Sequence, residues 1–315
     1  MGKFLLKTFV FLILISISAY FVFLEADGYT DPFYLRFTTP KQTSLILGTS
    51  RAAQGIQPQI LNKILNRSDL FNYSFSIDKS PYGPTYLNSI IKKLDANTKN
   101  AIFILTVDPW SISSKCEDPN DISNFSELKL SLATTKYVNV KPNIEFLINN
   151  YSEPYYKILL KSDAAMMLHK DGWLEVNIDM DSALVQQRIE QKMTTYKRDN
   201  CPFYKFSSIR LQYLLKTIDF LQHHGQVYLV RLPIHPLMME LDENLMPDFN
   251  EQINRISKQK NTPYLDMTYL NAKQKFTDGN HLYKESGFQI TKIIGEWILK
   301  LQHNIGTNKT KLSIN

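Results

Sequence analysis

Short apolar runs alternate along the chain with longer stretches in which apolar residues recur at helical spacing. The run at 101–107 is apolar throughout, which is typical of a central parallel strand buried on both faces. Strand, helix and strand in repeated succession predict a parallel sheet with helices on both faces, a three-layer α/β/α domain. The predicted strands are 44–47, 70–76, 101–107, 226–232 and 262–267, and the predicted helices are 58–65, 85–94, 209–224, 248–259 and 284–302.

A different pattern opens the chain. Lys3 and Lys7 precede an uncharged run of 17 residues, Thr8 to Leu24, which is near the minimum length for a membrane-spanning helix. The two lysines favour a cytoplasmic N-terminus, so we expect a single-pass protein of the cytoplasmic (inner) membrane with its main domain outside the cytoplasm. A cleaved signal peptide is the alternative, but the bulky residues that follow the run do not form a small-residue cleavage site.

These patterns divide the chain into parts. Residues 1–26 are expected to form the anchor with a short cytoplasmic start, 27–42 a juxtamembrane linker, 43–302 the α/β domain, and 303–315 a loose polar tail. The sheet pattern stops at about 111–208, a polar and mainly helical insertion with helix-like stretches near 143–150 and 182–196. Two interpretations of the insertion stay open: it covers the carboxyl ends of the strands and shapes a substrate groove, or it is a peripheral excursion.

Charge and composition exclude several classes of function. The net charge of +6 is scattered, without the block of Lys and Arg that follows a phosphate backbone, so no nucleic-acid partner is expected. Such a charge is compatible with anionic lipid or envelope polymer. Cys116 and Cys201 are too few for a zinc site and form either one disulfide or two free thiols. The six His form no metal motif and no Gly-rich phosphate loop is present, so we expect no metal and no cofactor.

The candidate chemistry begins where the first predicted strand ends. Gly48, Thr49 and Ser50 form a tight turn after the strand, and a helix-compatible run follows from Arg51 to Gln54. A serine in this place stands clear of the sheet, and the start of the helix supplies free N–H groups and the positive end of a helix dipole. Taken alone, the same three residues are also typical of an ordinary turn.

A second motif lies near the end of the chain. Asp278 and His281 are three residues apart in a turn that precedes the last predicted helix. A nucleophilic serine needs a base, and the base needs an acid that fixes its tautomer. In a parallel sheet, ligands collect at the carboxyl ends of the strands. Besides Ser50, the segments expected there are the loop 72–80, Asp108 with the two residues after it, His235, and the Asp278/His281 turn.

A Gly-x-Ser at a strand end together with a late Asp-x-x-His resembles the SGNH (GDSL-like) hydrolases, and especially their membrane-anchored bacterial branch. That resemblance implies a flavodoxin-like fold, Ser50 as an acyl-accepting nucleophile, His281 as base, and Asp278 as the acid that orients it. In this family the oxyanion hole uses the N–H of the serine, a Gly N–H after the second strand, and an Asn side chain after the third. The second block fits the segment that starts at Asn72, but Ile77 stands where Gly is common, and Asp108 lies where the Asn is expected. An ionised Asp108 cannot donate to an oxyanion.

Two further residues carry open alternatives. Arg51 either binds an anionic acceptor or carrier, or forms an ion pair that holds the turn. His235 either lines the pocket or is a structural histidine.

The resemblance implies a membrane-anchored esterase or O-acyltransferase that acts on an acylated envelope glycan through an acyl-serine. By the same resemblance it works beside a multipass membrane acyltransferase. The alternatives are a non-catalytic binding or assembly subunit of an envelope complex, and a membrane-associated lipase or lysophospholipase.

Overall fold

A five-stranded parallel sheet forms the centre of the protein. The computed structural model describes residues 1–160 and 165–312. The strand order is β2-β1-β3-β8-β9, and every neighbouring pair is parallel. This order confirms the α/β fold predicted from the pattern. The strands are β1 (Ser44–Leu47), β2 (Leu70–Asn72), β3 (Ala101–Thr106), β8 (Gly225–Arg231) and β9 (Tyr264–Asp266).

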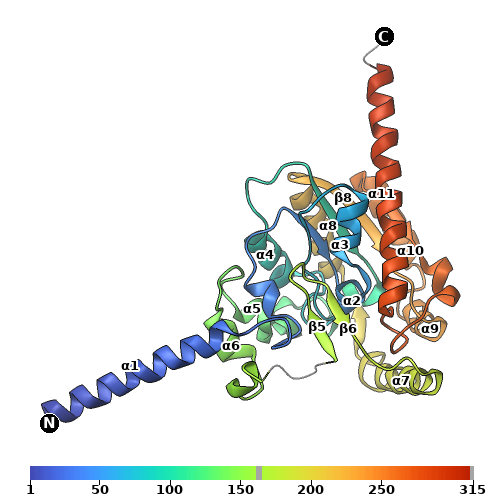
Figure 1. Ribbon diagram of the computed structural model, residues 1–315. Coiled ribbons are helices and arrows are strands. Elements are labelled where there is room, and N and C mark those ends of the chain that lie inside the picture. The colour runs from blue at the N-terminus through green and yellow to red at the C-terminus, as the bar shows by residue number, and fades with distance from the viewer. Residues whose placement is uncertain (161–164, 313–315) are drawn as a thin grey trace.

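Alternate strand residues face opposite sides of the sheet, and each side carries its own hydrophobic core. On one face the strands pack against α4 (Pro84–Lys93), α8 (Ser208–Gln222) and α10 (Phe249–Lys260). On the other face they pack against α2 (Ser50–Gly55), α3 (Pro58–Ile64) and α11 (Lys284–Leu312). The sheet thus lies between two helical layers, as Figure 1 shows.

The helix α1 (Gly2–Leu24) projects from this body and is long and apolar enough to cross a bilayer (Figure 1). Residues 27–42, which were expected to form a linker, instead pack into the body. Tyr34 and Phe37 of the 3-10 turn η1 (Tyr34–Phe37) are fully buried, and so is the Arg36 side chain. The linker prediction is therefore wrong, because this polar-looking segment contributes aromatic side chains to the core.

The insertion at 111–208 has both ends in one antiparallel strand pair, β4 (Ser113–Lys115) with β7 (Tyr204–Phe206). Between them, the described residues form a second strand pair, β5 (Met166–Leu168) with β6 (Leu174–Val176), and three α-helices. No strands were predicted in this part of the chain, because each is only three residues long. The helices are α5 (Ser131–Thr134), α6 (Ile144–Asn150) and α7 (Ser182–Thr195).

One more helix was missed, and the ends of two elements differ from the prediction. Helix α9 (Pro236–Leu245) was missed because His235 and the prolines on both sides of it suggested a loop, although proline is well suited to the first turn of a helix. Strand β2 ends at Asn72 and not at Ser76. Helix α11 runs to Leu312, beyond the predicted end at residue 302 and into the segment expected to be a loose tail.

Candidate active site

The turn that carries Ser50 is held rigidly. Gly48 has a φ of +147°, and a side chain there would overlap the hydroxyl of Thr106 on the neighbouring strand, so only glycine fits. The Gly48 N–H donates to Tyr86 Oη at 3.0 Å, and its carbonyl accepts from Ser80 Oγ at 2.7 Å. The loop after β2, which contains Ser80, is therefore hydrogen-bonded to the turn that presents Ser50.

Ser50, His281 and Asp278 form a continuous hydrogen-bonded set. His281 Nε2 lies 2.8 Å from Ser50 Oγ, and His281 Nδ1 lies 2.9 Å from Asp278 Oδ2. Asp278 Oδ1 also accepts the backbone N–H groups of Asn280 and His281, each at 3.0 Å. His281 is buried, whereas Ser50 is partly exposed and accessible to a ligand. This arrangement has the geometry of a serine nucleophile, a base and an orienting acid.

The loop that carries Asp278 and His281 is closed on itself. Phe276 and Leu282 form an antiparallel bridge, and the Thr277 N–H donates to the His281 carbonyl at 2.9 Å. Gly279 has a φ of +82°, a left-handed conformation that glycine adopts without strain. The tight loop explains how two residues three apart reach the same serine.

Helix α7 of the insertion adds a cation to the site. Lys192 Nζ lies 2.9 Å from Asp278 Oδ2, and Arg188 Nε donates to the Thr277 carbonyl at 2.8 Å. Burial by itself would raise the pKa of Asp278, but the charges of His281 and Lys192 outweigh it and hold that pKa well below its ordinary value. Asp278 is therefore an ionised carboxylate. This part of the insertion borders the site, whereas α5 packs against α4, and α6 packs against α5.

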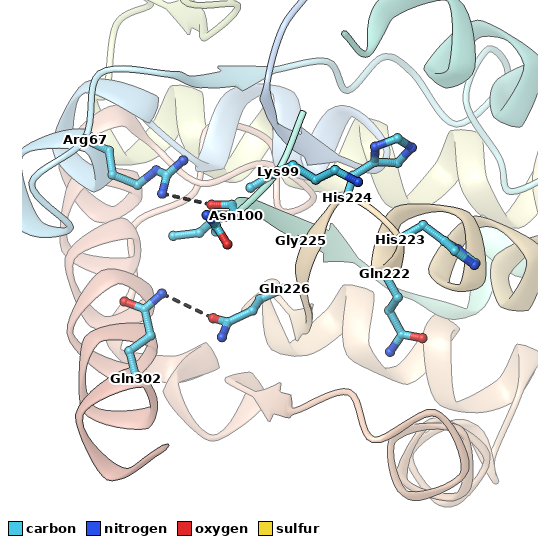
Figure 2. Close-up of a pocket in the computed structure, with 11 residues that line it drawn as sticks. Arg67, Lys99, Asn100, Gln222, His223, His224, Gly225, Gln226 and Gln302 are labelled. Carbon is cyan, nitrogen blue, oxygen red and sulfur yellow. Dashed lines mark hydrogen bonds between the residues drawn. The ribbon is translucent and has the colours of Figure 1, made fainter. Parts of the chain in front are cut away.

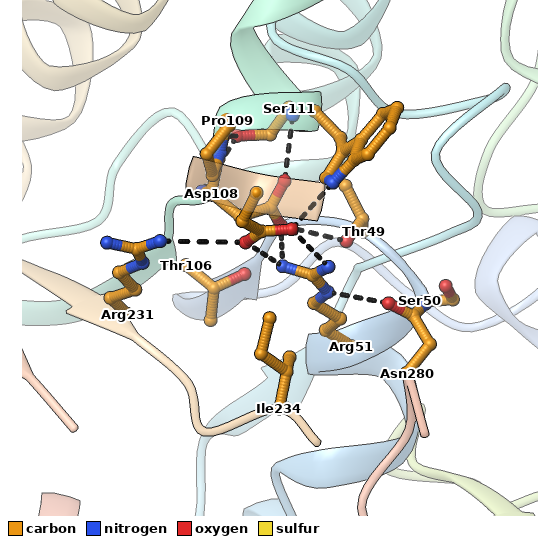
Figure 3. A network of polar contacts seen from close by, with 12 residues as sticks. Thr49, Ser50, Arg51, Thr106, Asp108, Pro109, Ser111, Arg231, Ile234 and Asn280 are labelled. Carbon is orange, nitrogen blue, oxygen red and sulfur yellow. Dashed lines mark hydrogen bonds and ion pairs between the residues drawn. The ribbon is translucent and has the colours of Figure 1, made fainter. Parts of the chain in front are cut away.

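Arg51, beside Ser50, sits in a buried network of charges (Figure 3). Its guanidinium bonds both oxygens of Asp242 on α9, at 2.9 and 3.0 Å, and its Nε donates to Asn280 Oδ1 at 3.0 Å. Burial acts to lower the pKa of Arg51, but Asp242 and Asp108 raise it above its ordinary value. Arg51 thus ties the serine turn to the residue that precedes His281.

Asp242 and Asp108 complete that network. Asp242 also accepts from Trp110 Nε1 at 2.7 Å and lies 3.6 Å from Arg231 Nη2. Asp108 accepts from the Ser111 N–H at 2.9 Å, and its other oxygen lies 3.5 Å from Thr49 Oγ1 and 3.9 Å from Arg51 Nη1. Burial raises the pKa of Asp108. Asp108 therefore contacts the residues on both sides of Ser50.

Four candidate residues have protein partners. The guanidinium of Arg51 bonds Asp242 and Asn280, which is the contact expected of an ion pair that holds the turn. The Asn72 amide donates to the Ala52 and Ile56 carbonyls, at 2.9 and 3.0 Å, and so supports α2 and its end. His235 Nδ1 accepts the Leu237 N–H at 3.3 Å and caps α9, and burial lowers its pKa. Asp108 caps the 3-10 turn η2 (Pro109–Ile112).

Ile77 is the remaining candidate. Its side chain packs against an apolar cluster that includes Trp110 and Tyr204. Among the residues that the structure describes, neither the Ile77 N–H nor the Ser50 N–H donates a hydrogen bond to another protein group. Within the described residues, no protein acceptor thus occupies either group.

Lys192, Asp242 and Asn280 were not predicted as site residues. Asn280 lies inside the motif that marked Asp278 and His281, so its position was a usable signal. Asp242 sits on the helix that was missed, and Lys192 sits in the insertion, where the sequence carries no chemical motif.

A cavity of about 510 Å³ lies at the opposite edge of the sheet (Figure 2). It is lined at the amino ends of β3 and β8 by polar residues that include Arg67, Lys99 and His224. None of the candidate site residues lines it. Within the described ranges, no group of His, Cys, Asp and Glu is arranged to hold a metal ion, and Cys116 and Cys201 are both free.

A comparison with known protein families finds no match for this chain, and a search of curated proteins finds no relative. Among solved structures, the chain is similar to that of Est24, a carbohydrate acetylesterase from Sinorhizobium meliloti. The two share 10% identical residues over 83% of this chain and all of the other, with a TM-score of 0.37. A similarity of this size assigns neither a substrate nor a reaction to the chain.

Proposed function

We propose that the protein is a membrane-anchored, serine-dependent esterase or O-acyltransferase that works through an acyl-serine intermediate. The observation that carries this proposal is the unbroken set Ser50–His281–Asp278, with 2.8 Å between the serine oxygen and the imidazole and 2.9 Å between the imidazole and the carboxylate. Contacts of this length in this order are the recognised geometry of an activated serine.

The chemistry follows from the positions of the atoms. Ser50 Oγ attacks the carbonyl carbon of an ester while His281 Nε2 takes the serine proton. Collapse of the tetrahedral intermediate expels the alcohol, which takes that proton from His281 and leaves the acyl group on Ser50. Water or a sugar hydroxyl then attacks the acyl-serine, again with His281 as base, and Ser50 is restored. Asp278 stays ionised throughout and stabilises the imidazolium.

The negative oxygen of the intermediate needs hydrogen-bond donors. The backbone N–H groups of Ser50 and Ile77 are the donors that we assign to it, since both belong to segments bonded to Gly48 and neither has a protein partner in the described parts of the chain. The third donor of the resembled family is missing, because Asp108 is committed to Ser111, Thr49 and Arg51. One missing donor costs about 10²–10³ in rate, so simple esters are expected to react slowly.

The setting of the site supports a substrate of the cell envelope. The helix α1 is the proposed anchor in the cytoplasmic membrane, with the body on its outer side. By resemblance to the anchored SGNH branch, the substrate is an acylated envelope glycan, and a multipass membrane acyltransferase is the partner that supplies the acyl group.

Labelling with a fluorophosphonate probe tests the activated serine. The detergent-solubilised full chain should react with the probe, and Ser50→Ala and His281→Ala should abolish the reaction. Ser182→Ala, at an exposed serine of α7, is the matched control and should label like the wild type. A folded wild type that does not label would contradict the proposal and favour a binding or assembly subunit.

A further inference from the structure

The last turn of α1 is docked onto the insertion. Phe23 is buried, and its ring packs edge-on against Tyr155 with 5.0 Å between ring centroids. Tyr155 belongs to the 3-10 turn η5 (Tyr155–Ile158), and its hydroxyl donates to the Leu147 carbonyl of α6 at 3.4 Å. Turn η5 and helix α6 therefore lie together at the foot of α1.

The chain after α1 fixes this arrangement. Ala26 and Tyr34 are fully buried, and the ring of Tyr34 packs against Phe146 on the inner side of α6. Arg36 Nε donates to the Asn72 carbonyl at 3.0 Å, and its Nη2 donates to the Gly172 carbonyl at 2.6 Å. Because these contacts tie the juxtamembrane segment to the sheet and the insertion, α1 and the body form one unit with a defined orientation.

Apolar side chains stand exposed beside this junction. Helix α6 buries Phe146 and Leu147 but turns Ile144 and Ile148 outward, with 40% and 61% of each exposed. In and after η5, four more large side chains are 41–66% exposed. We call this set the foot patch: Ile144, Ile148, Tyr155, Tyr156, Leu159 and Leu160.

Soluble surfaces rarely expose so many large apolar residues side by side. The foot patch is continuous with the exposed apolar surface of α1 through the contact of Phe23 with Tyr155. That contact places Tyr155 level with the end of the membrane span, where tyrosine is enriched in membrane proteins because it has an apolar ring and a polar tip.

We propose that the foot patch is a membrane-contact surface that inserts into the interface of the lipid bilayer around α1. This inference rests on the membrane anchoring in the proposed function, and not on its acyl chemistry. Lys157, the charged residue within η5, pairs with Glu153 at 2.6 Å. Binding through the patch is therefore apolar and insensitive to salt, unlike attraction to anionic lipid. The contact sets the orientation of the Ser50 site above the membrane.

A lipid-quenching experiment tests the surface in the full chain. Single cysteines are introduced in a Cys116→Ser/Cys201→Ser background as Tyr156→Cys and Leu159→Cys, labelled with an environment-sensitive fluorophore, and placed one chain per phosphatidylcholine nanodisc. Phe203→Cys and Tyr269→Cys are controls at exposed side chains outside the patch, 53% and 66% exposed. Val10→Cys, within α1, reports on the anchor itself. Each is measured with and without lipid that carries a quencher, placed near the headgroup for the positions on the body and on the acyl chain for position 10.

The probes at 156 and 159 should lose severalfold more fluorescence to the quenching lipid than the probes at 203 and 269, at low and high salt alike. Equal quenching at patch and control positions would overturn the inference. Patch probes that are shielded from water but not quenched would overturn it too, since protein would then cover the patch. An unquenched probe at position 10 would refute the anchoring on which the inference rests, while fluorophosphonate labelling would still report separately on Ser50.

Discussion

The position of Ser50 is set by its two neighbours in sequence. Thr49 and Arg51 both contact Asp108, and Arg51 also contacts Asn280, the residue before His281. The neighbours therefore position the serine and its base relative to each other without facing a substrate. Arg51 and Asp108 could be placed beside the serine from the sequence. The sequence could not choose between the two roles of Arg51, because its partner Asp242 lies far away along the chain.

Lys192 is expected to influence the proposed base His281 through Asp278, which contacts both residues. Its ammonium group forms an ion pair with the same carboxylate that stabilises the imidazolium of His281. Lys192→Met removes one of the charges that hold the pKa of Asp278 below its ordinary value, so Asp278 takes up a proton at higher pH than in the wild type and then no longer stabilises the imidazolium. The acid limb of the pH profile of fluorophosphonate labelling should move up by roughly one pH unit.

Two further variants separate charge from packing at this position. Lys192→Arg should keep the wild-type profile, because it keeps the cation. Lys197→Met, at an exposed lysine beyond the end of α7, should also leave the profile in place. An unchanged profile in Lys192→Met would show that the lysine has no influence on the proposed base.

At the scale of elements, one carboxylate joins four segments. Asp242 on α9 bonds Arg51 at the start of α2 and Trp110 in η2, and it lies near Arg231 at the end of β8. These segments meet at the carboxyl ends of the strands, where the sequence already indicated a site. The five strands of the central sheet and most helices were predictable because their hydrophobic spacing is regular. Helix α9 was not, since its start is marked by two prolines and a histidine.

The Asp242→Asn substitution tests this junction. An amide cannot offer two acceptor oxygens to Arg51, and it leaves the buried charges of Arg51 and Arg231 short of a counter-ion. Breaking a buried ion pair in this way should lower the free energy of unfolding by about 3–5 kcal/mol. Urea unfolding of the detergent-solubilised chain, followed by tryptophan fluorescence, measures it. Glu243→Gln, at the exposed neighbour, is the control, and equal urea midpoints for the two variants would contradict the assigned role.

At the scale of the whole molecule, the insertion has two separate roles in the structure. Its α7 end borders Asp278, and its α6 and η5 portion meets the foot of α1. One part of the insertion thus lies beside the candidate site and another lies beside α1. These two contacts of the insertion, with α1 and with the Asp278 loop, could not be predicted, because they depend on how distant segments pack. The apolar run that forms α1 was predictable because its length and composition are local properties.

The central claim is that Ser50 carries an acyl group during the reaction. The most direct test incubates the full chain with p-nitrophenyl acetate, quenches it with acid, and maps acetylated peptides by mass spectrometry. The acyl-serine mechanism predicts one acetyl group on Ser50 in the wild type, none on that peptide in Ser50→Ala, and a strongly reduced amount in His281→Ala. An acetyl group found only on other residues, or equal acetylation of Ser50 in wild type and His281→Ala, would contradict the claim.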